Sequence, residues 1–302
     1  MASIAYKFET HSPAQHEGVK LSSPLDMPVN LSALLPGNEG EVLTALSASS
    51  LTNVIMSGFV RDNGLVSSLN RGRFYAYRNE QSELEGVGLI GHTILFEAFS
   101  ENAIQAFAKL ARHEEPAHLL MGEHTAVQRF WSYYADKEQT PRLICPVAFL
   151  RCHEPFHENP SIHDLRPATQ ADLEQVVRAQ ASMAFETSGV DPLKKDPAGF
   201  RERYLRRIEK GRVWVLMKND RLIFKTDIIS DTPQATYIEG VYVSPEERGK
   251  GIGRNCVSAL GRIFLQRTKE IFLFVEQENQ RTQSFYLNLG FSIGGQYDLV
   301  YV

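Results

Sequence analysis

Cysteine is scarce in this sequence, and long apolar runs are missing. The three cysteines, Cys145, Cys152 and Cys256, form no C-x-x-C pair, which argues against both a disulfide framework and a zinc site. No stretch reaches the roughly 20 apolar residues that a membrane helix requires, and Met1 to Lys20 fits neither a secretory signal nor a membrane anchor. We therefore expect a cytoplasmic protein without a membrane partner.

An excess of positive charge is also lacking. The chain has 32 Lys and Arg against 36 Asp and Glu, a formal net charge of -4, so it offers no broad basic field for a nucleic-acid backbone. His153, His157 and His163 are spaced along a segment that contains two prolines, and this spacing fixes no common face. We expect neither a nucleic-acid partner nor a bound metal.

The length of 302 residues and the 43% hydrophobic content suit two globular domains. The segment CHEPFHENPSIHD between the halves is polar and broken by prolines, which is typical of a connector. We predict an N-terminal arm over residues 1–36, a first domain over 37–152, a linker over 153–163 and a second domain over 164–302.

Hydrophobic periodicity predicts mixed α/β structure in both halves. In the first half, one or two helices precede strands over 74–77 and 87–96, a helix over 100–111, a short strand over 118–121, a helix over 125–135 and a strand over 143–150. In the second half we expect helices over 170–184 and 200–209, strands over 213–217, 222–229 and 236–243, a helix over 253–267, a strand over 271–276, a helix over 282–289 and a last strand over 297–302.

A glycine-rich turn joins a predicted strand to a predicted helix in the second half. It reads Arg248-Gly249-Lys250-Gly251-Ile252-Gly253. Unpaired N–H groups at a helix N-terminus, with the positive end of the helix dipole behind them, bind phosphate. Glycine at these places permits positive φ or a close approach of the phosphate to the backbone. The sequence therefore predicts a phosphate-binding turn, and its R-x-x-G-x-G spacing differs from the dinucleotide fingerprint.

Two blocks of the second half together resemble the GNAT superfamily of N-acetyltransferases. Val241 to Gly253 is similar to its acetyl-CoA motif, a strand and turn followed by [QR]-x-x-G-x-[GA]. Asn279 to Phe291 is similar to its second block, in which Asn precedes a helix bearing Tyr and then Gly-Phe. The resemblance covers roughly residues 161–302, and both blocks have the family's order and separation.

The resemblance implies a GNAT fold with a mixed central sheet, two of whose strands splay apart around acetyl-CoA as co-substrate. Main-chain groups of Val241 and Val243 are then expected to pair with the pantetheine arm. The residues expected to contact the co-substrate are Val241, Tyr242, Val243, Arg248, Gly249, Lys250, Gly251, Ile252, Gly253, Arg254 and Asn279, the last as a contact or as a helix cap.

The implied reaction is direct attack of a neutral amine on the thioester. Because alkylamines are protonated at neutral pH, a base is needed. Glu239 is the candidate, since it lies two residues before Val241 on one face of the strand; an ordinary strand carboxylate is the alternative. Tyr286 matches the family position that protonates the leaving thiolate, with a packed aromatic as the alternative.

Other features of the acceptor side and of the chain's function stay open at this stage. Glu186 and Asp191 are candidates for attracting a cationic small-molecule or peptide amine, or are solvated loop acids. The favoured function is an acetyl-CoA-dependent N-acetyltransferase, an acyltransferase enzyme. The alternatives are a non-catalytic acyl-CoA-binding regulatory module and a longer acyl donor such as succinyl. A homodimer is also left open.

The first half resembles a degenerate second copy of the same fold, so that the chain is similar to tandem GNAT proteins. Where the phosphate turn should stand, it reads Phe96-Glu97-Ala98-Phe99-Ser100-Glu101-Asn102-Ala103. This segment has no glycine, and acids occupy the places of the phosphates. We expect this half to shape the active half rather than to bind acetyl-CoA.

Overall fold

The computed structural model describes residues 30–302, apart from 48–50, 115–116, 137, 155–161 and 163. Most of the predicted arm and linker, with His157 and His163, lies outside the described residues. Within the described residues, no helix is long and apolar enough to cross a membrane. The same residues include no group of three or more His, Cys, Asp or Glu side chains that could hold a metal ion.

The chain folds into two compact units that exchange strands. In the described part of the chain, the N-terminal unit contains residues up to Ala148 and Gly295–Val302, and the C-terminal unit contains Phe149–Gly294. Strands β6 (Leu143–Cys152) and β12 (Ser292–Tyr301) are therefore each divided between the units. The predicted domains are continuous stretches of sequence, and their boundaries stay a prediction. The compact units differ in that residues 295–302 belong to the N-terminal unit.

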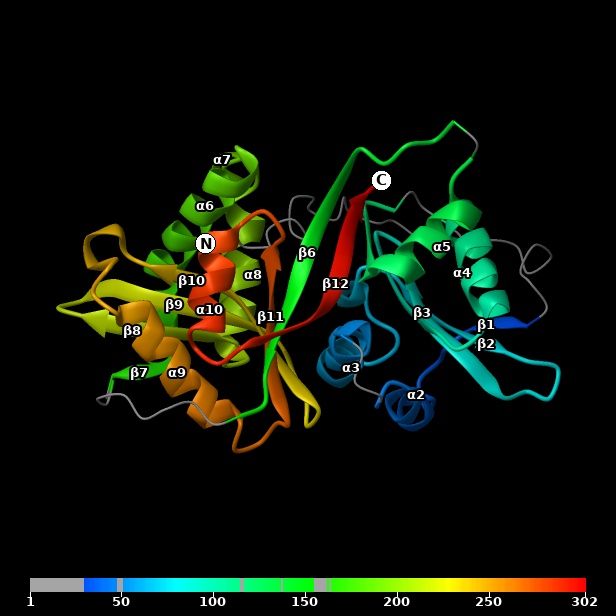
Figure 1. Ribbon diagram of the computed structural model, residues 1–302, viewed down its shortest axis with the longest axis horizontal. Helices are drawn as coiled ribbons and strands as arrows, with labels where there is room; N and C mark the ends of the chain where they lie inside the picture. The colour runs from blue at the N-terminus through cyan, green and yellow to red at the C-terminus, as the bar shows by residue number, and fades with distance from the viewer. Residues whose placement is uncertain (1–29, 48–50, 115–116, 137, 155–161, 163) are drawn as a thin grey trace. The chain divides into compact units, whose positions relative to one another are not determined.

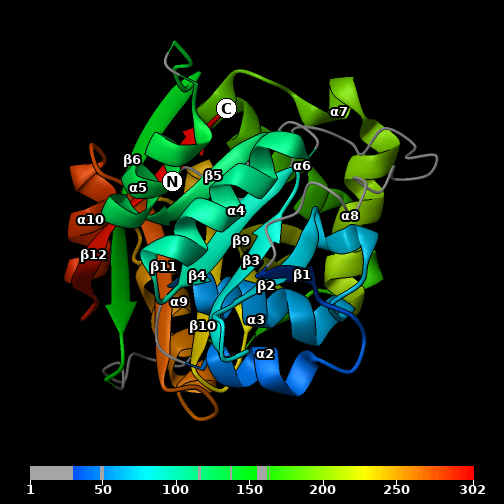
Figure 2. The same cartoon turned by 90° about the vertical axis from the view of Figure 1, so that its right-hand side faces the viewer.

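The sheet of the N-terminal unit has the order β1-β2-β3-β4-β5-β12. Its neighbouring strands are antiparallel, except that β4 and β5 are parallel. Helices α4 and α5 lie side by side on one face (Figure 2). The remaining bounds are β1 (Leu31–Ala33), α2 (Glu39–Ala45), α3 (Leu51–Asn63), η1 (Ser68–Asn70), β2 (Arg73–Arg78), β3 (Leu84–Ile90), β4 (Thr93–Ala98), α4 (Glu101–His113), β5 (Leu119–Glu123) and α5 (His124–Tyr134).

One expected strand of the N-terminal unit, over residues 87–96, is wrong. A turn at Gly91 divides this segment between β3 and β4. Gly91 has a φ of +153°, and a Cβ there would lie 2.7 Å from the Cα of Gly72. Only glycine fits such a close approach of two backbones, and an apolar run does not reveal it.

The sheet of the C-terminal unit has the order β6-β11-β10-β9-β8-β7, with β10 and β11 parallel and the pairs from β7 to β10 antiparallel. Helices α9 and α10 cover one face, and α6 and α8 cover the other (Figure 1). Its bounds are β7 (Leu165–Pro167), η2 (Gln170–Asp172), α6 (Leu173–Ser188), α7 (Pro192–Lys195), α8 (Pro197–Glu209), β8 (Val213–Lys218), β9 (Arg221–Asp231), β10 (Ala235–Val243), η3 (Pro245–Glu247), α9 (Ile252–Phe264), β11 (Glu270–Glu276) and α10 (Gln280–Leu287).

The two faces of this second sheet carry separate cores. Val257, Leu260 and Phe264 recur at helical spacing on α9 and are buried against Phe224 and Ile238 of the sheet. On the opposite face, side chains of α6 and α8 pack against β8. Burial on both faces explains why β11 is a nearly continuous apolar run, from Ile271 to Val275. The predicted fold class, mixed sheets flanked by helices in two tandem halves, is confirmed.

Candidate active site

A cleft opens in the C-terminal unit where β10 and β11 part. Their parallel pairing joins Ala235 to Glu270, Thr236 to Ile271 and Tyr237 to Phe272. Beyond these pairs the two strands and α10 enclose the cleft. Its lining consists of Ile238, Glu239, Gly240, Val241, Leu273, Phe274, Val275, Glu276, Asn279, Thr282 and Tyr286.

A β-bulge in β10 accompanies this parting. Glu239 faces Asp227 on β9, but Tyr242 already faces Lys225, so two residues of β10 oppose Thr226 alone. Gly240, within the bulge, has a φ of +61°, and the Thr226 hydroxyl donates a 2.9 Å hydrogen bond to the carbonyl oxygen of Glu239. Because a bulge bends its strand, it turns β10 further from β11 beyond their last parallel pair, Tyr237 with Phe272.

The main chain after the bulge presents an edge to the cleft side. The N–H of Ser244 bonds back to Ile223 on β9. Because main-chain groups of successive strand residues point to opposite edges, those of Val243 point away from β9. Arg248 Nε donates to the Val243 oxygen at 3.1 Å, so one acceptor of the predicted pantetheine edge already has a partner within the chain.

The glycine turn follows directly and opens α9. Gly249 and Gly251 have φ values of +79° and +78°, and a Cβ on Gly249 would meet no atom within 4 Å. No side chain caps α9, whose first-turn N–H groups lack intrahelical acceptors. At Gly253 a Cβ would lie 3.3 Å from Val243. The turn is therefore an open cradle of main-chain donors, which fits a pyrophosphate.

The predicted cations of this turn lie at the surface. Arg248, Lys250 and Arg254 are exposed, and Lys250 Nζ is 3.2 Å from a carboxylate oxygen of Glu247. Exposed charges of this kind attract an anion over a distance but contribute little each in salt. Ile252, the first residue of α9, is half-buried.

The second predicted block supplies the wall formed by α10. Asn279 Oδ1 accepts a 3.1 Å hydrogen bond from the N–H of Thr282, so its side chain caps α10, which was one of its two expected roles. Tyr286 is 3% exposed and packs edge-on between Phe285 and Phe291. Burial raises the pKa of the Tyr286 phenol above its usual range, which keeps the proton on this group at neutral pH.

Glu239 lies on the β10 wall of the cleft. It is 7% exposed, and its Oε2 accepts a 3.0 Å hydrogen bond from the Tyr237 hydroxyl. This bond orients the carboxylate. The structure thus brings Glu239, Val241, Asn279 and Tyr286 together around one cleft.

The two predicted acceptor-side acids lie outside the cleft lining among the described residues. Asp191 Oδ1 accepts from the N–H of Leu193 and caps α7. Glu186 is exposed near the end of α6. Burial and the carboxylates of Glu246 and Glu186 raise the pKa of Tyr242, while Arg248 opposes them, so Glu186 acts electrostatically on a residue of β10.

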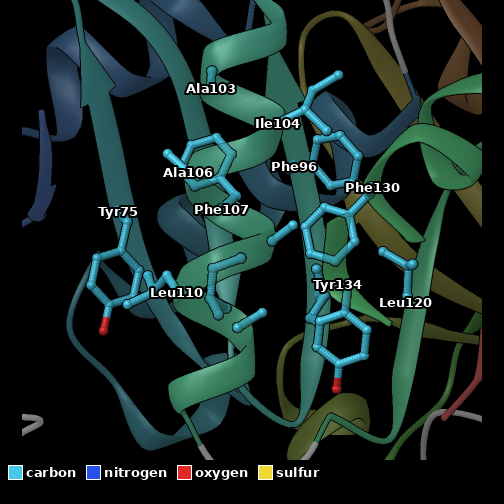
Figure 3. Packing of buried hydrophobic residues seen from close by; sticks show 14 of the residues in the cluster. Tyr75, Phe96, Ala103, Ile104, Ala106, Phe107, Leu110, Leu120, Phe130 and Tyr134 are labelled. Atoms are coloured by element: carbon cyan, nitrogen blue, oxygen red, sulfur yellow. The ribbon is translucent and has the colours of Figure 1, made fainter. Parts of the chain in front are cut away.

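The corresponding features of the N-terminal unit are closed. The pairing of β4 with β5 ends at Ile94 and Leu120, but Phe96, Phe130 and Tyr134 stack in series beyond it (Figure 3). The first turn of α4 is capped, since Ser100 accepts from the N–H of Ala103. Aromatic side chains thus fill the space that corresponds to the open cleft of the C-terminal unit. The Ser100 side chain also binds a main-chain N–H at the start of α4.

Several lining residues were not predicted as site residues. They are Ile238, Gly240, Leu273, Phe274, Val275, Glu276 and Thr282. Gly240 had a signal, because an isolated glycine within an apolar strand marks a bulge. The β11 residues gave no such sequence signal, since a buried strand and a strand that lines a cleft have the same apolar pattern.

Comparisons with known proteins agree with this geometry. Residues 177–291 match the Acetyltransferase (GNAT) family. The fold is similar to that of a Drosophila protein (TM-score 0.65, 10% identity, covering 90% of this chain and 98% of that one). A tandem GNAT protein from the clavulanic acid biosynthesis pathway is also similar (TM-score 0.56, 14% identity, 90% and 97%).

A third similar structure is a GCN5-related N-acetyltransferase from Sphaerobacter thermophilus (TM-score 0.56, 13% identity, 91% and 96%). A search of curated proteins gave no match. At these identities the structural likeness concerns the fold, and the family assignment rests on residues 177–291. Residues 177–291 therefore match the GNAT acetyltransferase family, and the chain has the fold of GNAT proteins, a tandem one among them.

Proposed function

We propose that the C-terminal unit transfers an acetyl group from acetyl-CoA to a primary amine. The observation that carries this proposal is the continuity of β10, which lines the cleft and then enters the uncapped glycine turn of α9. A thioester joined to a pyrophosphate by a long flexible arm matches such a site, with the phosphates at one end and the reacting carbonyl at the other. When bound, acetyl-CoA supplies the activated acetyl group.

The chain's own residues then have distinct tasks. Gly249 to Gly253 hold the pyrophosphate through main-chain N–H groups, and Arg248, Lys250 and Arg254 add positive charge. The Val241 and Val243 edge aligns the pantetheine arm. Glu239, oriented by Tyr237, accepts the proton of the amine directly or through a water molecule.

Tyr286 holds its proton next to the expected position of the leaving sulfur. Because burial raises its pKa, proton transfer to a thiolate with a pKa near 8.5 is uphill. Tyr286 is therefore assigned to hydrogen bonding with the sulfur more than to full proton transfer. Of the acceptor-side candidates, Glu186 is preferred over Asp191, whose carboxylate caps α7.

The direct test is thiol release from acetyl-CoA in the presence of polyamines, amino acids, aminoglycosides and peptides. Gly251→Glu should abolish CoA binding, because it places a carboxylate and a strained φ in the cradle. The matched control is Gly211→Glu, since Gly211 has a similar φ of +65° and open space around it but no part in the cleft. Equal CoA affinity in both variants would contradict the proposal.

The same assay separates the second candidate function, a non-catalytic acyl-CoA-binding module. The raised pKa of Tyr286 favours this candidate, because it weakens the only phenol that lines the cleft among the described residues. Binding of CoA by calorimetry without thiol release on any amine would support the module. The same thiol-release assay with succinyl-CoA in place of acetyl-CoA tests a longer acyl donor.

A further inference from the structure

A buried charged network lies directly behind the β10 bulge. Lys225 and Asp227 of β9 have no exposed surface. Lys225 Nζ lies 2.8 Å from both carboxylate oxygens of Asp227 and donates to Gln180 Oε1 of α6 at 2.6 Å. From α8, the Tyr204 hydroxyl donates to Asp227 at 3.2 Å, and an Arg207 guanidinium nitrogen lies 3.6 Å from the same carboxylate.

This network contacts the bulge through Gly240. A Cβ built on Gly240 would lie 3.0 Å from Asp227 Oδ2, 3.1 Å from Lys225 Nζ and 3.4 Å from Gln180 Oε1. The Gly240 main chain therefore rests against the ion pair without space for a side chain. On the other side, Gly240 and Val241 line the cleft.

Net stability does not explain such a network. Removing two charges from water is costly, and well-packed apolar residues in place of a buried ion pair often give a protein of equal or greater stability. A hydrogen-bonded pair instead fixes positions, because each donor and acceptor must keep its partner in a medium of low dielectric. Residues of two other elements, α6 and α8, converge on these two side chains of β9.

We propose that Lys225 and Asp227 are positioning residues that support the β10 bulge and thereby hold the Gly240–Val241 main chain against the thioester carbonyl. This inference rests on the proposed function. The phosphate cradle is formed by a different segment, so the network should affect how the carbonyl is held and not how tightly CoA binds.

The test variant is Lys225→Met/Asp227→Leu, which removes both charges and keeps comparable volume. With acetyl-CoA labelled with 13C at the carbonyl, the bound signal of the wild type should show the downfield shift of a hydrogen-bonded carbonyl. In the double variant we expect this shift to diminish while the Kd for CoA stays within about threefold. Since small misplacements at a reacting centre cost up to about 100-fold, kcat should fall by roughly 10-fold to 100-fold.

A matched control is Arg166→Met/Asp172→Leu. Like the test pair, this pair joins a basic side chain, here an arginine, to a buried aspartate, at 2.7 Å, but neither residue lines the cleft. The control should leave the carbonyl shift and kcat at wild-type values, whatever its effect on thermal stability. A folded Lys225→Met/Asp227→Leu protein with the wild-type shift and kcat would overturn the proposal.

Gly240→Ala is an independent second test of the proposal, which remains available if the double variant does not fold. Its Cβ pushes against the network, so it should weaken the carbonyl shift, whereas Gly211→Ala, at a comparable positive φ, should not. When Gly240→Ala is added to the double variant, kcat should fall by less than the product of the two separate decreases. A decrease equal to that product, or an unchanged carbonyl shift in Gly240→Ala, would count against the proposal. A wild type that binds no CoA would instead refute the proposed function itself.

Discussion

At the scale of single residues, the cleft contains a shielded and oriented carboxylate. Glu239 is almost fully buried, and the Tyr237 hydroxyl fixes one of its oxygens. We expect Glu239→Gln to lower kcat/KM for the amine by about 100-fold to 10,000-fold, the usual contribution of a general base, without a change in the Kd for CoA. Steady-state kinetics and calorimetry measure the two effects. Glu270→Gln, on β11 outside the cleft lining, is the control and should stay near wild type.

Tyr286 gives a second prediction at this scale. Burial raises its folded pKa above the value of about 10 in the unfolded chain, so its neutral form favours folding. This contribution is complete below about pH 10 and is lost as the pH rises above that value. In urea unfolding, wild type should lose stability relative to Tyr286→Phe only above about pH 10. A difference in unfolding free energy between wild type and Tyr286→Phe that changes between pH 6 and 8 would contradict the raised pKa of Tyr286.

At the scale of elements, the two units differ at the start of one helix. Positive-φ glycines precede helix α9, which has no side-chain cap, whereas Ser100 caps α4. Gly251→Ala should lower the free energy of unfolding by about 1–2 kcal/mol, because αL is strained for alanine, and should weaken CoA binding. Ser100→Ala should cost about 1 kcal/mol and leave CoA binding unchanged. Loss of CoA affinity in Ser100→Ala would indicate that CoA binds the N-terminal unit and would contradict the proposed site.

The same contrast shows what the sequence could reveal. The turn and α10 were predictable because their signals are local: glycines that precede an apolar helical pattern, and Asn279 three residues before Thr282. Sequence alone could not place Lys225 and Asp227 behind Gly240, because the contact depends on strand register and on helices that precede them in the chain. Gly91 shows the same limit, since its need for glycine arises from contact with Gly72.

At the scale of the whole molecule, β12 belongs to the N-terminal unit from Gly295 onward. Residues 297–301 pair antiparallel with β5, and His124 of α5 lies 2.8 Å from the buried Asp298. Periodicity predicted a strand over 297–302 but gave no indication of its partner, because pairing between distant segments depends on the complete fold. The final residues therefore stabilise the half of the sequence that lacks the open cleft.

This exchange makes a prediction that separates the two units. Leu299 has no exposed surface and lies on the part of β12 that completes the N-terminal sheet. Leu299→Ala should cost about 2–5 kcal/mol of local stability through lost burial and a cavity. Hydrogen exchange should then accelerate in β4, β5 and α5, while α9, β10 and the affinity for CoA stay unchanged. Leu260→Ala, in the core beneath α9, should give the reverse pattern. Equal acceleration in both units after either substitution would show that they unfold as one cooperative body and would contradict the prediction.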